Sequence, residues 1–185
     1  MSDLKITAAA VAERAAKIRL LILDVDGVLT DGRLYFDDDG KESKAFHVRD
    51  GYGIKMIQAQ LVDVAIITAR FSPAVAHRAR DLGIKHLFQG CKNKHLAYSE
   101  LKLELGIDDG AVAFMGDDLI DLPILTCAGL ATAPADAHSE VVKRVHWQSQ
   151  ERGGCGAVRE LCDLILQAKG CWPDVVARAS AQGHC

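Results

Sequence analysis

The fold is decided by the stretch Ile18-Arg-Leu-Leu-Ile-Leu-Asp24-Val-Asp26-Gly27-Val-Leu-Thr30. Its first half is almost entirely apolar, which is typical of a strand that is buried on both faces of a parallel sheet. Its second half places two carboxylates, Asp24 and Asp26, directly after that strand. Gly27 lets the backbone approach its neighbours closely. The stretch therefore predicts a central strand that delivers acidic groups to one edge of a sheet.

Strands and helices alternate along the rest of the chain. The expected strands span 18–23, 64–67, 86–88, 112–115 and a short segment near Leu130. The expected helices span 8–17, 53–61, 72–82, 93–105, 122–128, 139–142 and 156–168. Two short strands, 33–36 and 44–48, are expected to form a hairpin around the turn at 37–40. The order predicts an α/β fold: a three-layer, Rossmann-like parallel sheet with helices on both faces, a short β-hairpin insertion and no cap domain.

Composition limits the classes of function. The chain has 185 residues, with 22 basic and 25 acidic side chains, so nothing predicts affinity for nucleic acid or an anionic membrane. Its longest apolar runs are too short to cross a bilayer and no signal pattern opens the chain, so we expect a cytoplasmic protein. The six cysteines contain no C-x-x-C pair and are expected to be reduced thiols. The length suits one domain over residues 1–185.

Polar groups follow each of the four buried strands. They are Asp24 and Asp26 after the first strand, Thr68 and Arg70 after the second, Lys94 after the third, and Asp117, Asp118 and Asp121 after the fourth. Ligands of such folds bind beyond the carboxyl ends of the strands, where these groups would meet. Carboxylate oxygens are hard ligands that suit Mg²⁺. The sequence therefore predicts a magnesium site at this edge.

The same set suits phosphoryl transfer. Asp24 can attack phosphorus and carry the group as an acyl phosphate, and Asp26 can protonate the leaving alcohol and later activate water. Thr68 offers a hydroxyl and a backbone N–H to phosphate oxygens, and Lys94 adds a positive charge. Each signal alone has an ordinary explanation, because D-x-D pairs are common turns and lone lysines are common surface charges. Their joint appearance after successive strands favours a catalytic site.

Four motifs in this order resemble those of the haloacid dehalogenase superfamily of phosphatases. Asp24-x-Asp26-Gly-Val-Leu-Thr matches the first motif, Thr68 the second, Lys94 the third, and Gly116-Asp-Asp with Asp121 the fourth. The resemblance implies that Asp24 is the nucleophile and Asp26 the acid and base. It also implies that Mg²⁺ is held by Asp24, the Asp26 carbonyl and Asp117, with Asp121 supporting this set.

Longer motifs are similar to the family of 3-deoxy-D-manno-octulosonate 8-phosphate phosphatases. The matching stretches are 24–32, 46–53, 116–123 and 153–160, within a resemblance that covers about residues 10 to 170. It implies magnesium-dependent hydrolysis of that sugar acid phosphate through an aspartyl phosphate, in lipopolysaccharide biosynthesis. Ala69 and Cys155 depart from the family pattern, which usually has glycine and arginine there. Two alternatives stay open: a phosphatase for a nine-carbon sugar acid phosphate of the sialic acid type, and a non-catalytic oligomerisation module.

Neither interval between the motifs has room for a folded cap domain over the site. The resemblance implies a homotetramer, in which the hairpins close into a central barrel and each C-terminal tail closes a neighbouring site. An exposed hairpin edge needs pairing or covering, although a small solvated hairpin is the simpler alternative. The tail, from about residue 153, is glycine-rich and expected to be mobile until docked, and the chain beyond 170 is weakly specified.

The carboxylate of a sugar acid needs cationic partners, and the arginine fork binds two oxygens at once. The resemblance implies that Arg78 and the loop from His47 to Gly51 contact the sugar acid. The complete set of residues expected to bind substrate is Asp26, His47, Val48, Arg49, Asp50, Gly51, Lys55, Arg70, Arg78, Lys94 and Asp118.

Overall fold

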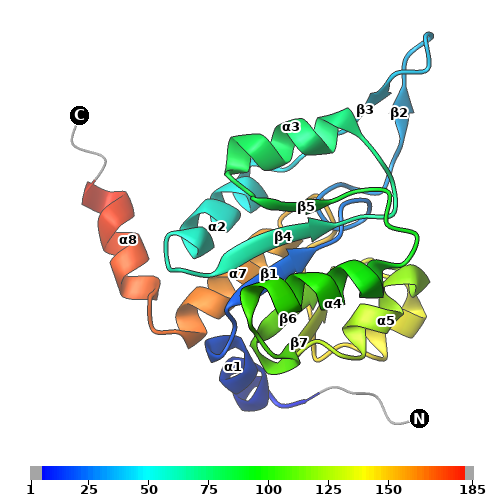
Figure 1. Ribbon diagram of the computed structural model, residues 1–185. Coiled ribbons are helices and arrows are strands. Elements are labelled where there is room, and N and C mark those ends of the chain that lie inside the picture. Colours follow the sequence, from blue (N-terminus) through cyan, green and yellow to red (C-terminus); the bar gives the residue numbers. More distant parts are fainter. Residues whose placement is uncertain (1–5, 182–185) are drawn as a thin grey trace.

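A six-stranded sheet runs through the centre of the molecule (Figure 1). The computed structural model describes residues 6–181. The strand order is β5-β4-β1-β6-β7-β8, and every pair of neighbours is parallel. The strands are β1 (Leu20–Leu23), β4 (Asp63–Ile67), β5 (His86–Phe88), β6 (Val112–Met115), β7 (Leu130–Ala133) and β8 (Trp147–Gln148). This confirms the predicted parallel sheet. The sequence gives no sign of β8, because two half-buried residues make no periodic pattern.

Helices cover both faces of the sheet. Alternation along β1 sends Leu21 and Leu23 into one apolar cluster and Leu20 and Ile22 into another. The first cluster is completed by α1 (Ala8–Ala16), α2 (Val48–Gln58), α3 (Pro73–Leu82) and α7 (Ala157–Ala168). The second is completed by α4 (Lys94–Leu105), α5 (Leu122–Leu125) and α6 (Ser139–Val142). The predicted three-layer arrangement is therefore confirmed.

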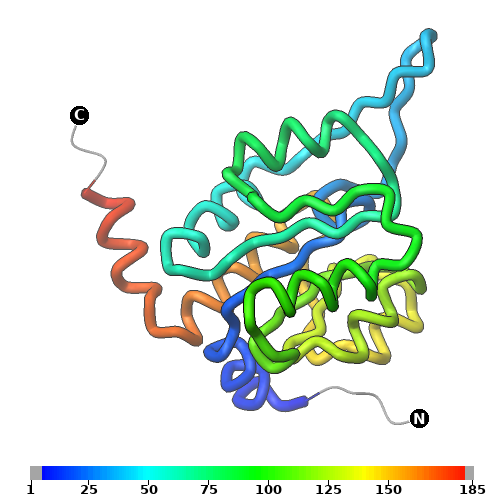
Figure 2. The backbone as a smooth tube through the Cα atoms, viewed as in Figure 1, coloured from blue at the N-terminus to red at the C-terminus, as the bar shows by residue number. Residues whose placement is uncertain are grey.

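The hairpin formed by β2 (Tyr35–Phe36) and β3 (Glu42–Ser43) rises away from the sheet (Figures 1 and 2). The prediction of a second strand over 44–48 and a helix from Gly53 is wrong, because α2 already begins at Val48. The glycines at 51 and 53 both lie inside α2. In the structure their missing side chains permit close packing, since a Cβ at Gly51 would lie 2.2 Å from Arg78 Nη2.

The chain after residue 153 differs from the expected mobile tail. Gly153 is buried, and α7 places six residues of its apolar face in the core: Ala157, Val158, Leu161, Cys162, Ile165 and Leu166. A further helix, α8 (Trp172–Ala181), follows and lies at the opposite end of the molecule from the hairpin (Figure 1). The amphipathic period of α7 overrides the flexibility that its preceding glycines suggest.

Two further expectations can be compared with the described part of the chain. Cys91, Cys127, Cys155, Cys162 and Cys171 are free thiols, as expected, and Cys185 lies outside the described residues. Within residues 6–181, no helix is both long and apolar enough to cross a bilayer.

Candidate active site

A cavity of about 250 Å³ opens at the carboxyl ends of the central strands. β4 and β5 lie on one side of β1, and β6 and β7, which come later in the chain, lie on the other. The cavity lies at this change of direction in the strand order. Its lining residues are Asp24, Asp26, Gly32, Thr68, Ala69, Arg70, Lys94, Asp117, Asp118 and Ile120. The structure thus brings together the polar groups that follow the four predicted strands.

Asp24 directly follows β1 and is held by the sheet, since its N–H donates to the Met115 carbonyl at 3.1 Å. Its side chain is 6% exposed, with Oδ2 2.8 Å from Lys94 Nζ. The other oxygen, Oδ1, is buried and has no hydrogen-bond partner among the described residues. Burial, together with the Asp121 carboxylate, raises the pKa of Asp24 to about 6, although Lys94 opposes the shift. Asp24 therefore presents one paired oxygen and one oxygen free for chemistry.

Lys94 begins α4, whose amino end is capped by the Asn93 side chain. Its Nζ lies 2.8 Å from Asp24 Oδ2 and 2.8 Å from Asp121 Oδ1. Burial opposes the charge of Lys94, but the two carboxylates outweigh it and raise the pKa of the amine. The lysine therefore stays cationic beside the nucleophile and tethers α4 to the loop after β6.

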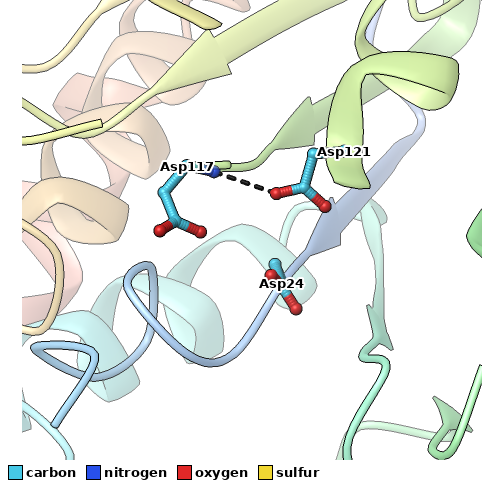
Figure 3. Close-up of side chains that lie close together, drawn as sticks. All are labelled: Asp24, Asp117 and Asp121. Atoms are coloured by element: carbon cyan, nitrogen blue, oxygen red, sulfur yellow. Dashed lines mark hydrogen bonds between the residues drawn. The ribbon is translucent and has the colours of Figure 1, made fainter. Parts of the chain in front are cut away.

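Asp121 organises that loop from a fully buried position. Its Oδ2 accepts hydrogen bonds from the backbone N–H groups of Asp117, at 3.0 Å, and Asp118, at 3.3 Å. Figure 3 shows the first of these bonds and the three carboxylates of Asp24, Asp117 and Asp121 turned toward one region. Both carboxylate oxygens of Asp121 already have partners, Lys94 on one and the two N–H groups on the other. The role of Asp121 is therefore to position Asp117.

The donor set fits magnesium. Asp24, Asp117 and Asp121 each offer a carboxylate oxygen, and these oxygens lie within 4.8 Å of one another. Burial, with the charges of Asp24 and Asp121, raises the pKa of Asp117 to about 8, so Lys94 does not fully balance the negative charge of the three carboxylates. A hard divalent cation held by the Asp24 and Asp117 carboxylates would supply the missing positive charge. Gly27 makes room for Asp117, because a Cβ there would lie 2.1 Å from Asp117 Oδ2.

Asp26 is flanked by Arg70, which the sequence singled out, and by Lys44, which it did not. Lys44 Nζ pairs with Asp26 Oδ1, and the Lys44 side chain is only 1% exposed. Arg70 Nε lies 3.7 Å from Asp26 Oδ2, while Arg70 Nη2 lies 2.5 Å from Glu42 Oε2. Glu42 and Lys44 are two apart on an extended segment and so share one face, which is the only local signal for them. Lys44 thus reaches the predicted acid and base from the end of the hairpin, and Arg70 reaches it from the segment after β4.

Thr68 follows β4 and is 2% exposed. Its N–H donates to the Phe88 carbonyl at 2.9 Å, which fixes the backbone beside the cavity. Its Oγ1 accepts a long hydrogen bond from the Arg70 N–H at 3.4 Å. The hydroxyl proton remains available for an anion in the cavity. Asp118 and Ile120 are exposed at the rim.

Seven residues expected to bind substrate do not line this cavity: His47, Val48, Arg49, Asp50, Gly51, Lys55 and Arg78. Arg78 donates to the His47 carbonyl at 3.5 Å and lies over the Phe46 ring. Lys55 borders a separate groove between α2 and α8. Asp50 is buried. Apart from Lys55, these residues lie at the start of α2 or, as Arg78 does, contact it.

The comparisons with known proteins agree with this geometry. No protein-family model matches the chain. A solved hydrolase of the haloacid dehalogenase superfamily, subfamily III A, from Legionella pneumophila is 45% identical, with a TM-score of 0.89 over 91% of this chain and 93% of that one. The fold and the site thus define the class as a capless hydrolase of that superfamily.

Relatives with a named activity narrow the class. A 3-deoxy-D-manno-octulosonate 8-phosphate phosphatase from Yersinia pestis is 51% identical over 159 residues, 86% of this chain and 85% of that protein. A solved structure of the phosphatase of that name from Moraxella catarrhalis contains magnesium, phosphate and the sugar acid. It is 37% identical, with a TM-score of 0.89 over 91% of this chain and 97% of that one. The chain belongs to the family of 3-deoxy-D-manno-octulosonate 8-phosphate phosphatases.

Proposed function

We propose that this chain hydrolyses 3-deoxy-D-manno-octulosonate 8-phosphate to the free sugar acid and phosphate, with Mg²⁺ as cofactor. The observation that carries the proposal is the buried Asp24, which has one oxygen held by Lys94 at 2.8 Å and the other without a partner. The names of the relatives supply the substrate. The reaction then serves lipopolysaccharide biosynthesis.

In the first step, Asp24 Oδ1 attacks phosphorus and the bond from phosphorus to the sugar oxygen breaks. Asp26 donates a proton to that oxygen as it leaves, so the sugar departs as a neutral alcohol. Lys94 and the Thr68 hydroxyl bind phosphate oxygens and stabilise their charge. Magnesium held by Asp24 and Asp117 would supply the positive charge that offsets the charge of the phosphate oxygens.

In the second step, water attacks the phosphorus of the aspartyl phosphate. Asp26 now accepts the proton of that water, and the bond from phosphorus to Asp24 breaks. Phosphate leaves and the Asp24 carboxylate is restored. Lys44 and Arg70, which flank Asp26, keep it oriented toward the cavity through both proton transfers.

We also propose that the molecule works as a homotetramer. The hairpin exposes Leu34, Tyr35 and Phe36, at 43%, 45% and 59%, and an apolar edge of this kind favours covering by another copy. A neighbouring copy would also bring Arg78 and the exposed Val48 and Arg49 at the start of α2 within reach of a substrate they do not meet in their own chain. Since α7 belongs to its own core, a tail that reaches a neighbour begins after Gly170. Static light scattering that finds only monomers would remove this part of the proposal.

We place the reaction in the cytoplasm, where free thiols such as those at Cys127 and Cys155 stay reduced. No nucleic acid or membrane partner is proposed. Residues 1–185 are taken as one phosphatase domain.

The test is phosphate release from a panel of sugar phosphates, with Mg²⁺ and with chelator. We expect preference for 3-deoxy-D-manno-octulosonate 8-phosphate, lost in chelator and reduced about 10³-fold or more in Asp24→Asn. Asp81→Asn, which changes an exposed carboxylate on α3, is the matched control and should keep full activity. Preference for a nine-carbon sugar acid phosphate would overturn the substrate, and no release from any member would favour an oligomerisation module.

A further inference from the structure

Asp50 is a buried carboxylate that the proposed reaction does not use. It lies in the first turn of α2 and is 1% exposed, so it does not reach the cavity as the sequence reading expected. Its Oδ1 accepts a hydrogen bond from the backbone N–H of Arg159 at 2.8 Å. Its Oδ2 has no hydrogen-bond partner among the described residues and lies 3.9 Å from His47 Nδ1. A buried carboxylate held in this way needs an explanation.

Asp50 caps a helix that has no cap of its own. The first N–H groups of any helix lack internal partners, and α7 begins after Gly156, which has no side chain to supply one. The Asp50 carboxylate fills this role from 109 residues earlier in the chain, and its negative charge suits the positive end of the helix. It therefore fixes the start of α7 against the start of α2.

The loop just before α7 lies directly against the loop that carries the nucleophile. Gly154 N–H donates to the Val28 carbonyl at 2.9 Å. A Cβ at Gly153 would lie 1.9 Å from the Gly27 carbonyl oxygen, and one at Gly154 would lie 2.5 Å from the Thr30 carbonyl carbon. The backbones of these two loops are in direct contact. A shift at the start of α7 therefore displaces the segment that follows Asp26.

We propose that Asp50 is a positioning residue that, through the start of α7 and Gly153–Gly154, holds the Gly27–Thr30 loop and thereby orients Asp26. The inference rests on the proposed function, in which Asp26 protonates the leaving group. Misplacing a proton donor slows the step that needs the proton, and leaves substrate affinity and proton-independent steps little changed.

The experiment compares two substrates in the full-length protein with Mg²⁺. One is the sugar 8-phosphate, whose alcohol needs a proton to leave, and the other is p-nitrophenyl phosphate, whose phenolate leaves without one. For Asp50→Ala we expect kcat on the sugar phosphate to fall roughly 10- to 100-fold. KM, and the rate of the first-turnover burst of nitrophenolate from the aryl phosphate, which precedes the water attack that also needs Asp26, should stay within about 3-fold of wild type. Asp50→Asn keeps an acceptor oxygen for the Arg159 N–H and should restore kcat to within about 3-fold of wild type.

A helix cap that only stabilises the fold would give a different result. Ile165→Val removes one methyl group from the buried face of the same helix and serves as the matched control. It should lower the melting temperature without changing the ratio of the two rates. If Asp50→Ala fails to fold, Asp50→Ser, which shortens the side chain by one atom, takes its place with the same measurements.

The outcomes distinguish a failure of the positioning role of Asp50 from a failure of the proposed function. A variant at Asp50 that melts earlier but keeps both rates, or loses both equally, overturns the positioning role while the proposed function stands. A wild-type protein that hydrolyses neither substrate overturns the proposed function, and the role of Asp50 falls with it.

Discussion

Replacing Lys94 by methionine tests the electrostatic account of the site most directly. The lysine is 4% exposed and its Nζ contacts two buried carboxylates, each at 2.8 Å. Methionine has nearly the same volume, so the change removes charge without leaving a large cavity. Taking one partner from a buried ion pair typically costs about 3–5 kcal/mol, because the remaining charge is left uncompensated. Since Asp24 and Asp121 both lose their cation, we expect a loss of about 4 kcal/mol at neutral pH.

The assay is urea unfolding in chelator and in Mg²⁺. We expect the loss to shrink in Mg²⁺, which restores positive charge beside Asp24, and to shrink at pH 5, where Asp24, whose pKa burial raises to about 6, takes up a proton. Phosphate release should fall about 10²- to 10³-fold, as it does when one donor to a transition-state oxygen is removed.

Lys102→Met is the matched control on the same helix. Lys102 pairs with Asp109, but that carboxylate is 47% exposed, and pairs of this kind contribute at most about 1 kcal/mol. A Lys94→Met protein whose free energy of unfolding in chelator is within about 1 kcal/mol of wild type, and whose activity is unchanged, would refute the reasoning.

Two further predictions concern the metal site. Gly27→Ala drives a Cβ to 2.1 Å from Asp117 Oδ2 at a φ of +87°, so we expect the dissociation constant for Mg²⁺, measured by calorimetry, to rise at least about 10-fold. Gly83→Ala has a similar φ, +70°, but open space around its Cβ, and an equal loss of affinity there would contradict the steric argument. The second prediction follows from Asp117, whose pKa burial and the charges of Asp24 and Asp121 raise from 3.8 to about 8. The metal-free fold then binds this proton more tightly than the unfolded chain, so its melting temperature should fall as pH rises from about 5 to 9. Stabilisation by Mg²⁺ should be larger at pH 9 than at pH 6, and Asp117→Asn should flatten the trend; a metal-free melting temperature that rises over this range would count against it.

Helix boundaries could be predicted from the sequence where the residues that set them lie within or next to the helix itself. The helix over 73–82 has proline at its start and Gly83 after it, and the structure ends it there with Gly83 at a φ of +70°. Gly106 ends α4 in the same way, at +60°. These boundaries depend on backbone conformations that few residues other than glycine adopt, so a single chain suffices to place them.

Features that depend on contacts with residues far along the chain could not be predicted from the sequence. The helix was predicted to begin at Gly53, although it begins at Val48. Gly51 and Gly53 lie where Arg78 and Arg159 pack against it. Lys44 reads as an ordinary surface lysine until the fold places Asp26 beside it. In each case the deciding contact is far along the chain, and no local pattern encodes it.

The sequence by itself determined the central strands and the polar group that follows each of them, because burial, periodicity and parallel topology together send those groups to one edge. Tertiary structure alone decided which oxygens of Asp24 and Asp121 are occupied, that Lys44 reaches Asp26, and that Asp50 caps α7 instead of facing the cavity. The physical reason is that hydrogen bonds and ion pairs depend on distances of a few tenths of an ångström, which only the packed fold sets.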